Sequence, residues 1–321
     1  MTKNKLATIT LMGVFLLQGG SGVFAQAAEK IPPTQSDVRY GPHERNLLDF
    51  WRAESERPTP LVFLVHGGGW NSGDKERANV LLNIPDLQKN NISVVSINYR
   101  YIAQAMKEGV VPPVKAPMDD ATRALQFIRT KAKEWNIDSS CIIGSGGSAG
   151  ACTVLWLALQ DDMADPSSAD PVLRESTRLA GAVLGGAQTT LDPVQMREWI
   201  PGITYGAHAF GFLVPGVNVP QAFEKFLQKR ESILSDIKKY SPIESLSADD
   251  PPLWLTYGEK KVVEKGEDLE EKTHSVQFGL LLAEKCKALG VPCVLEYPGI
   301  NNGVSRTSTE IILEAVKKIK K

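Results

Sequence analysis

The feature that most constrains the fold is a short apolar strand that runs through a glycine-rich turn into a helix. Residues 141–151 read Cys-Ile-Ile-Gly-Ser-Gly-Gly-Ser-Ala-Gly-Ala, and an apolar helical segment continues to Leu159. The turn, Gly146-Gly147-Ser148-Ala149-Gly150, has the form G-x-S-x-G. In a nucleophile elbow of this form the serine is exposed on a sharp turn, and its crowded neighbours must lack a Cβ atom. The pattern therefore predicts that Ser148 is a nucleophile at the top of a sheet.

A second glycine-rich loop lies upstream and supports this interpretation. The apolar run 61–65 leads directly into His66-Gly67-Gly68-Gly69-Trp70. Exposed backbone N–H groups in such a loop can stabilise the oxyanion of a tetrahedral intermediate. We predict an oxyanion hole formed by the amides of Gly68, Gly69 and Ala149.

Short apolar runs alternate with helical patterns along the rest of the chain. The apolar runs are 61–65, 92–97, 141–143, 179–184, 253–255 and 293–295. Apolar stripes at helical spacing predict helices over about 121–135, 278–289 and 311–319. This alternation is typical of an α/β fold, in which helices cross over a parallel sheet. We expect a mostly parallel sheet of about eight strands flanked by helices.

One region, residues 188–240, interrupts this rhythm with aromatic, glycine-rich and proline-rich sequence, followed by a charged amphipathic helix. We predict a cap-like insertion over the active site, within a single α/β-hydrolase domain that spans 28–321. Two uses are open for its aromatic side chains: packing within the insertion, or stacking on a sugar or an aromatic acyl group. The residues concerned are Trp199, Tyr205, Phe210 and Phe212.

The first 27 residues have the zones of a secretory signal. Lys3 and Lys5 precede a mostly apolar run over 6–24, and Ala25-Gln26-Ala27 offers a small-residue cleavage site. Glycines and a glutamine interrupt the run, which suits a cleaved signal better than a membrane span. We predict cleavage after Ala27 and a secreted or periplasmic protein, with no stable membrane insertion after cleavage.

The charge and the metal-ligating residues exclude some classes of partner. The chain carries 36 basic and 37 acidic residues, which are scattered rather than clustered. A nucleic-acid partner is therefore not expected. The four histidines are dispersed and no cysteine pair has zinc-site spacing, so no metal is predicted.

The four cysteines fall into two groups. Cys141 and Cys152 lie in a strand and at a helix start, where we expect buried, small apolar side chains. Cys286 and Cys293 are close enough in sequence to bridge a helix end to the next strand. In an oxidising compartment such a disulfide is permitted, and its state stays open.

Taken together, the motifs resemble the esterase/lipase branch of the α/β hydrolases. The resemblance rests on the 66–70 loop, Asp119-Asp120 before a helix, Trp135-Asn136-Ile137-Asp138 before a strand, and the 146–150 elbow. Within that branch the chain is most similar to exported bacterial esterases that include acetyl-ester and feruloyl-ester hydrolases acting on plant polysaccharide. The resemblance implies a Ser-Asp-His triad and a small-molecule or carbohydrate ester as substrate, with no cofactor.

At two positions the chain departs from that family's pattern. The family's acid usually follows a glycine by three residues after the strand read here at 252–257, and that position holds Lys261. The family's base lies in a Pro-Gly-x-x-His-Gly pattern, and that position holds Asn302. Asparagine cannot accept the serine proton at neutral pH, and lysine cannot orient an imidazole as a carboxylate does.

Other residues are candidates for the two missing roles. His274 is a candidate relocated base and Glu259 a candidate relocated acid, since both lie near the carboxyl edge of the sheet; the alternative for His274 is a solvated residue at a helix start. His208 is a further candidate because the insertion can place it over the site. We expect His66 to order its own loop and His43 to lie in a surface turn.

Two main hypotheses for function follow. In the first, the protein is a serine carboxylic-ester hydrolase that uses Ser148 and the His-Gly-Gly-Gly loop. In the second, it is a degenerate hydrolase that binds a ligand without turnover, which Lys261 and Asn302 favour. A third hypothesis is an interaction protein that kept only the scaffold, since a fold does not by itself determine a function.

Overall fold

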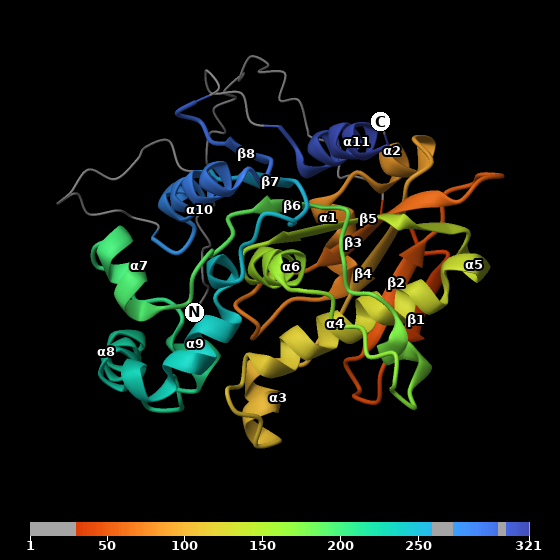
Figure 1. Cartoon of the computed structure of the whole chain (residues 1–321). Coiled ribbons are helices and arrows are strands. Elements are labelled where there is room, and N and C mark those ends of the chain that lie inside the picture. The colour runs from red at the N-terminus through yellow and green to blue at the C-terminus, as the bar shows by residue number, and fades with distance from the viewer. Residues whose placement is uncertain (1–29, 259–271, 301–305, 321) are drawn as a thin grey trace, which may run out of the picture.

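The computed structural model describes residues 30–258, 272–300 and 306–320 (Figure 1). The predicted signal peptide over 1–27, Glu259, Lys261 and Asn302 lie outside the described residues. Eight strands form one sheet in the order β1-β2-β4-β3-β5-β6-β7-β8. They are β1 (Gln35–Arg39), β2 (Leu47–Trp51), β3 (Thr59–Val65), β4 (Ser93–Ile97), β5 (Ile137–Gly147), β6 (Gly181–Gly185), β7 (Leu253–Thr256) and β8 (Cys293–Glu296).

Strand direction agrees with the predicted fold class. β1 pairs antiparallel with β2, and β2 pairs antiparallel with β4. From β4 to β8 every neighbouring pair is parallel. The mostly parallel α/β sheet of eight strands is therefore confirmed. β5 pairs with both β3 and β6, so the strand that leads into Ser148 lies inside the sheet.

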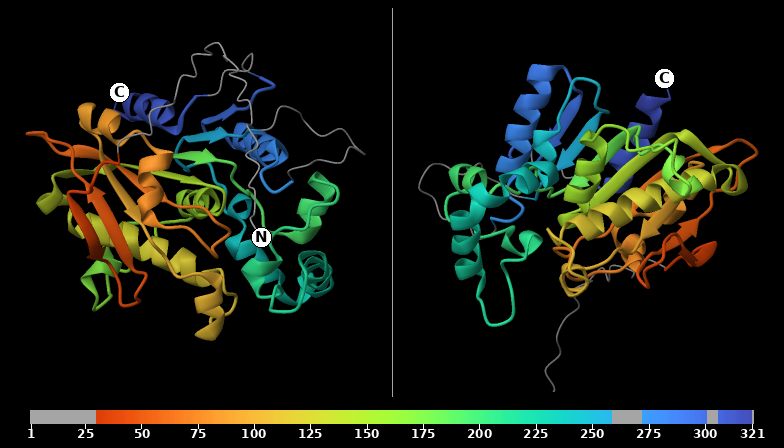
Figure 2. Two further views of the ribbon diagram at one scale, coloured as in Figure 1. Left: turned by 180° about the vertical axis from the view of Figure 1, so that it is seen from behind. Right: turned by 60° about the horizontal axis from the view of Figure 1, so that its bottom comes forward.

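Helices cover both faces of the sheet (Figure 2). The α-helices are α1 (Ala78–Leu81), α2 (Ile84–Lys89), α3 (Ile102–Lys107), α4 (Lys115–Thr130), α5 (Ala132–Trp135), α6 (Ala149–Leu159), α7 (Pro193–Trp199), α8 (Val219–Lys229), α9 (Leu234–Tyr240), α10 (Val276–Leu289) and α11 (Ser308–Ile319). Short 3₁₀ turns are η1 (Lys75–Arg77), η2 (Pro171–Arg174), η3 (Ala207–Phe210), η4 (Arg230–Ile233) and η5 (Pro242–Glu244).

The alternation of side chains along β3 explains the two hydrophobic cores. Successive residues of a strand point to opposite faces of the sheet. Phe63 packs in the core that includes α4, α6 and α10. Its neighbours Val62 and Leu64 pack in the core that includes α2 and α11. Because both faces are covered, the central strands are fully buried, as expected of a parallel sheet.

The helix expected over about 121–135 begins earlier than predicted. α4 starts at Lys115, so Asp119 and Asp120 lie within it rather than before it. The apolar stripe did not predict this part of the helix, because the buried residue at position 120 is a charged one. Asp120 is buried with its Oδ1 accepting a hydrogen bond from Arg100 Nη2 at 2.7 Å. The predicted end is correct, since Asn136 adopts a left-handed conformation with φ of 56°.

The segment 188–240 lies between β6 and β7 in the chain and contains α7, η3, α8, η4 and α9. α7, α8 and α9 gather at the lower left of Figure 1, beside the end of the sheet. Its aromatic side chains pack together: the ring centroid of Phe226 lies 5.0 Å from that of Phe210 and 5.4 Å from that of Phe212. Trp199 packs edge-on against Phe278 of α10. Of the two uses considered for these residues, the structure shows packing.

All four cysteines are free thiols. Cys141 and Cys152 are buried, as predicted for small apolar side chains. The thiols of Cys286 and Cys293 form a hydrogen bond with each other, which lowers the pKa of Cys286. The two residues are therefore neighbours without a disulfide.

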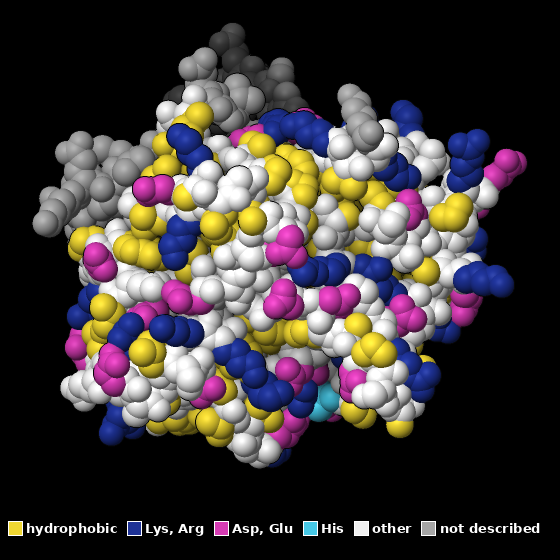
Figure 3. Space-filling model, in the orientation of Figure 1, with side chains coloured by type: hydrophobic (Ala, Val, Ile, Leu, Met, Phe, Trp, Pro, Cys, Tyr) yellow, Lys and Arg dark blue, Asp and Glu magenta, His cyan; other side chains and the backbone are white. Residues whose placement is uncertain are grey.

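Basic and acidic side chains are intermixed over the face of the molecule shown in Figure 3. Within the described ranges, no helix has the length and the apolar character needed to cross a bilayer.

Candidate active site

Ser148 occupies the sharp turn between β5 and α6. Its backbone has φ of 54° and ψ of −126°, a conformation that a residue with a side chain rarely adopts. The Ser148 N–H donates a hydrogen bond to Gly185 O at 2.8 Å, which ties the turn to the end of β6. A Cβ atom on Gly150 would lie 2.1 Å from Val65 O. The second glycine of the motif is therefore required because β3 passes directly against the start of α6.

The loop after β3 presents backbone amides to the same place. Gly68 and Gly69 have positive φ angles of 110° and 59°, which only glycine adopts readily. Among the hydrogen bonds of the described residues, the N–H groups of these two glycines donate to no acceptor. Trp70 anchors the loop, since its Nε1–H donates to Thr153 Oγ1 of α6 at 2.9 Å. The glycine loop and α6 are thus held together.

The third predicted oxyanion donor, Ala149, is the first residue of α6 and is buried. The N–H groups in the first turn of a helix have no intrahelical acceptor, so this amide is open to an oxyanion. Gly67 and Gly68 line the cleft beside Ser148, whereas Gly69 and Ala149 are not among the lining residues. Gly67 is a lining residue that the sequence pattern did not single out.

His66 orders the glycine loop, as predicted. Its ring is buried and stacks on Tyr99 with the ring centroids 4.3 Å apart. The Nδ1–H donates to the carbonyl of Gly67 at 2.8 Å, and the Tyr99 hydroxyl donates to His66 O at 2.8 Å. These bonds hold the backbone just before the glycines.

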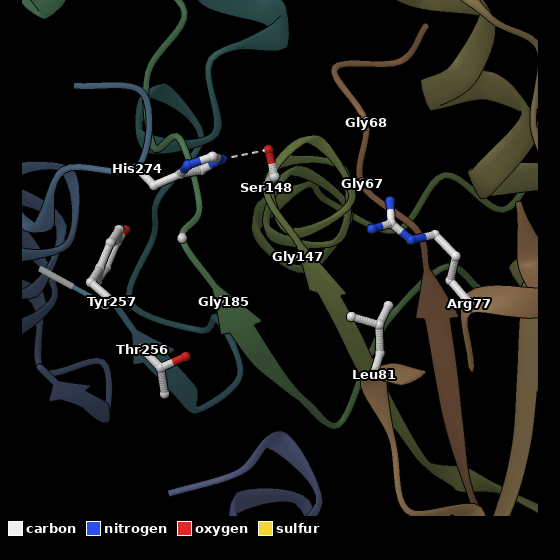
Figure 4. A pocket seen from close by; sticks show the side chains of 12 residues that line it. Gly67, Gly68, Arg77, Leu81, Gly147, Ser148, Gly185, Thr256, Tyr257 and His274 are labelled. Atoms are coloured by element: carbon white, nitrogen blue, oxygen red, sulfur yellow. Dashed lines mark hydrogen bonds between the residues drawn. The ribbon is translucent and has the colours of Figure 1, made fainter. Parts of the chain in front are cut away.

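His274 lies against Ser148. Its Nε2 is 2.8 Å from Ser148 Oγ, although the two residues are far apart in the sequence (Figure 4). This distance is within the range in which a base can take a proton from a hydroxyl. The alternative considered from the sequence, a solvated residue at a helix start, is wrong. His274 does precede α10, and its side chain is half-buried and turned toward Ser148.

Neighbouring segments determine where His274 lies. Gly186, just after β6, has φ of 58°, and a Cβ atom there would lie 3.2 Å from Cδ2 of the imidazole. The buried Gln188 donates from Nε2 to Thr273 O at 2.7 Å and fixes the residue before His274. The residue after it, Ser275, caps α10 by accepting a hydrogen bond from the N–H of Gln277. Hydrogen bonds therefore fix the residues before and after His274, and its imidazole packs against Gly186.

A cleft of about 790 Å³ opens in front of this pair. Its lining comes from the ends of β5, β6 and β7, from the glycine loop, and from η1 and α1. The lining residues are Gly67, Gly68, Arg77, Leu81, Gly147, Ser148, Gly185, Gly186, Thr256, Tyr257, Gly258 and His274. A ligand cleft at the carboxyl ends of parallel strands is the common arrangement in α/β proteins.

The sequence matches the model of the BD-FAE family over residues 48–271. The chain belongs to the BD-FAE family. The matched region includes Ser148 and the glycine loop and stops just before His274. The match therefore covers Ser148 and the glycine loop, whereas His274 lies outside the matched residues and its place beside Ser148 comes from the geometry alone.

Named relatives of this BD-FAE chain are esterases. Over 232 residues it is 26% identical to esterase LipQ of Mycobacterium tuberculosis, which covers 70% of this chain and 48% of the relative. The chain thus spans about half the length of that relative. A solved structure described as a truncated carbohydrate esterase from gut microbiota has a TM-score of 0.67 and 18% identity, over 92% of this chain and 99% of that one.

A second solved structure is described as an acetyl ester-xyloside bifunctional hydrolase from Caldicellulosiruptor lactoaceticus. Its TM-score is 0.62 at 19% identity, over 90% of this chain and 98% of that one. At these identities the likeness shows the fold. The expected resemblance to the α/β-hydrolase esterases is confirmed.

Two other histidines of this BD-FAE protein do not reach Ser148. His208 of η3 lies behind the glycine loop, with its ring centroid 5.8 Å from that of Trp70. Its Nε2 is buried and has no hydrogen-bond partner among the described residues. His43 lies in a turn before β2, with its Nε2 3.1 Å from Glu108 Oε1. Of the histidines considered from the sequence, the structure brings only His274 into contact with Ser148 Oγ.

We expect the stability of the protein to fall as the pH is lowered from about 6.5 to about 4. Burial lowers the pKa of both His66 and His208 to about 4 from an ordinary value near 6.5. In that window the unfolded chain binds protons that the folded chain does not, so acid favours unfolding. The loss is up to roughly 3 kcal/mol for His66, and less for the partly exposed His208.

Urea unfolding at a series of pH values measures this loss. His208→Gln should make the free energy of unfolding less dependent on pH in the acid range, with little change near pH 8. An unchanged pH dependence in that variant would show that His208 titrates normally.

Proposed function

We propose that the protein is a serine carboxylic-ester hydrolase in which Ser148 is the nucleophile and His274 is the general base. The observation that carries the proposal is the 2.8 Å distance between His274 Nε2 and Ser148 Oγ. Membership of the BD-FAE family and the esterase names of the relatives support the same reaction.

In the first half of the proposed reaction, Ser148 Oγ attacks the ester carbonyl carbon while its proton passes to His274 Nε2. This requires the neutral imidazole to carry its proton on Nδ1. The carbonyl oxygen becomes an oxyanion. When the intermediate collapses, the bond to the alcohol oxygen breaks, and His274 returns the proton to that oxygen. The alcohol leaves and the acyl group stays on Ser148.

In the second half, water attacks the acyl carbon and gives its proton to His274. Collapse of the second intermediate breaks the bond to Ser148 Oγ, which takes the proton back, and the carboxylic acid is released. The proposed reaction involves no metal or other cofactor.

The proposed oxyanion hole uses the amides of Gly68, Gly69 and Ala149. The open N–H groups of the two glycines and the helix start at Ala149 support this assignment. Such a donor typically lowers the barrier by roughly 3 kcal/mol when it is preorganised. The anchoring of the loop through Trp70 and His66 supports preorganisation, because both side chains are buried.

An acylated carbohydrate is the substrate class that we propose. Two solved structures of the same fold are described as a carbohydrate esterase and an acetyl ester-xyloside hydrolase. A cleft of about 790 Å³ is within the usual range for small-ligand sites. We also propose that the protein is exported, on the pattern of residues 1–27.

The rival hypothesis was a degenerate hydrolase that binds without turnover, and it rested on Lys261 and Asn302 at the family's acid and base positions. Asn302 occupies the position where the family pattern has histidine. His274 in contact with Ser148 offers an imidazole from a different segment, which argues for turnover.

Hydrolysis of 4-nitrophenyl acetate by the purified protein tests the proposal. We expect saturable release of 4-nitrophenol well above the buffer rate. A folded protein that binds short esters in calorimetry and releases no product would favour binding without turnover instead.

A further inference from the structure

The wall of the cleft that faces His274 carries a guanidinium group. Arg77, the last residue of η1, and Leu81, the last residue of α1, line this wall. In Figure 4 the Arg77 side chain extends toward Ser148 from the side opposite His274. Among the described lining residues, Arg77 alone carries a permanent charge. The cleft therefore has a positive wall.

The acidic residues nearest to Arg77 in the sequence are engaged elsewhere. Asp74 Oδ2 accepts a hydrogen bond from Asn98 Nδ2 at 2.8 Å, and Glu76 pairs with Lys30 at 2.8 Å. No described acidic residue forms an ion pair with Arg77. Arginine offers five donors in a planar fork that matches a carboxylate. The fork of Arg77 is thus open to a ligand in the cleft.

The charge of Arg77 also influences the pKa of His66, the residue that precedes the glycines of the loop. Burial is the main cause that lowers the pKa of His66, and the charges of Arg45 and Arg77 lower it further. Arg45 is occupied, since its Nε–H donates to Tyr99 O at 2.8 Å. Of these two arginines, Arg77 is the one that lines the cleft and can meet a substrate.

We propose that Arg77 is a specificity-determining residue that favours esters bearing a carboxylate over matched neutral esters. The inference rests on the proposed ester hydrolysis and names the substrate class of that same cleft. A carboxylate on the substrate would accept hydrogen bonds from the guanidinium while the ester carbonyl lies at Ser148. A charge-assisted contact of this kind corresponds to about a tenfold preference in kcat/KM at an exposed site.

The experiment compares kcat/KM for matched pairs of esters. For a charge on the acyl side, 4-nitrophenyl hydrogen succinate is compared with its methyl ester. For a charge on the alcohol side, 3-carboxy-4-nitrophenyl acetate is compared with 4-nitrophenyl acetate. The rate of uncatalysed hydrolysis is subtracted from each measured rate. We expect one of the two pairs to show the preference, which also identifies the side of the ester that faces Arg77.

Variants separate this role from general effects of charge. Arg77→Gln should bring the ratio of anionic to neutral kcat/KM close to one, and Arg77→Lys should retain part of it. Arg39→Gln is the matched control, because Arg39 is exposed on the edge strand β1 and should leave the ratio unchanged. Raising the salt concentration should reduce the wild-type ratio, since salt screens an exposed charge.

The outcomes are distinguishable. Hydrolysis of neutral and anionic esters at equal efficiency, or a preference that survives Arg77→Gln, would overturn the role of Arg77 and leave the proposed function in place. If no ester of either pair is hydrolysed, the proposed function fails and this inference fails with it.

Discussion

Replacing His274 by glutamine is expected to lower kcat/KM for 4-nitrophenyl acetate by on the order of 10⁴-fold at neutral pH, with little change in stability. Glutamine keeps a polar side chain beside Ser148 Oγ, and it cannot accept the hydroxyl proton. The loss should appear in kcat, because the proton moves only as the ester bond is attacked. Initial rates over a range of substrate concentrations measure the two parameters separately.

The pH dependence of the variant distinguishes a base from a structural residue. Without an imidazole, the residual rate of His274→Gln should rise with hydroxide concentration at alkaline pH. His43→Gln is the control, because its ring lies in a turn before β2 and does not contact Ser148, and it should keep most of the wild-type rate. Near-normal turnover by His274→Gln would contradict the proposed base.

Replacing Ser148 by alanine is expected to abolish covalent labelling by a fluorophosphonate and to lower kcat by on the order of 10⁵-fold. The nucleophilic oxygen is removed, whereas the Cβ atom and the strained turn stay. Some acceleration over water should persist, since the oxyanion amides and the cleft remain. Intact-mass measurement of the wild-type protein should show one added phosphonyl group, and the variant should show none.

A double variant gives a further check. Residues that act as a unit in catalysis are strongly non-additive. The Ser148→Ala, His274→Gln protein should therefore retain about the same residual rate as Ser148→Ala alone. A further large loss in the double variant would mean that His274 acts independently of the serine. Circular dichroism of each variant controls for folding.

Local patterns predicted the nucleophile and its loop. The G-x-S-x-G turn needs glycine where Gly150 passes β3, and the His-Gly-Gly-Gly loop needs positive φ at Gly68 and Gly69. The positive φ angles belong to a short stretch of backbone, whereas Gly150 is needed for its contact with Val65 of β3. In both cases the requirement appears in the sequence as a glycine within a short motif. The alternation of buried strands with helices is equally local, and it predicted the parallel sheet.

The histidine that contacts Ser148 could not be identified from a local pattern in the same way. The family pattern directed attention to position 302, and His274 was one of several dispersed histidines. No local signal distinguishes a histidine that meets a distant serine from one that faces solvent. Its place at the carboxyl edge of the sheet made His274 a candidate. The distance to Ser148 Oγ required coordinates.

Two further features were recognised only in the structure: the positive wall of the cleft and the packing of the aromatic side chains in segment 188–240. Arg77 lies in a charged stretch that reads as surface sequence, and the fold brings it opposite His274. The aromatic residues of segment 188–240 pack on one another, as at Phe226, rather than lining the described cleft.

The sequence by itself determined the α/β class, the sharp turn at Ser148 and the glycine loop, because each leaves a short local pattern of apolar residues or glycines. Only the tertiary structure decided which imidazole meets Ser148. That contact depends on the parallel register of β5, β6 and β7 and on the hydrogen bond from Gln188 to Thr273, which join segments far apart in the chain.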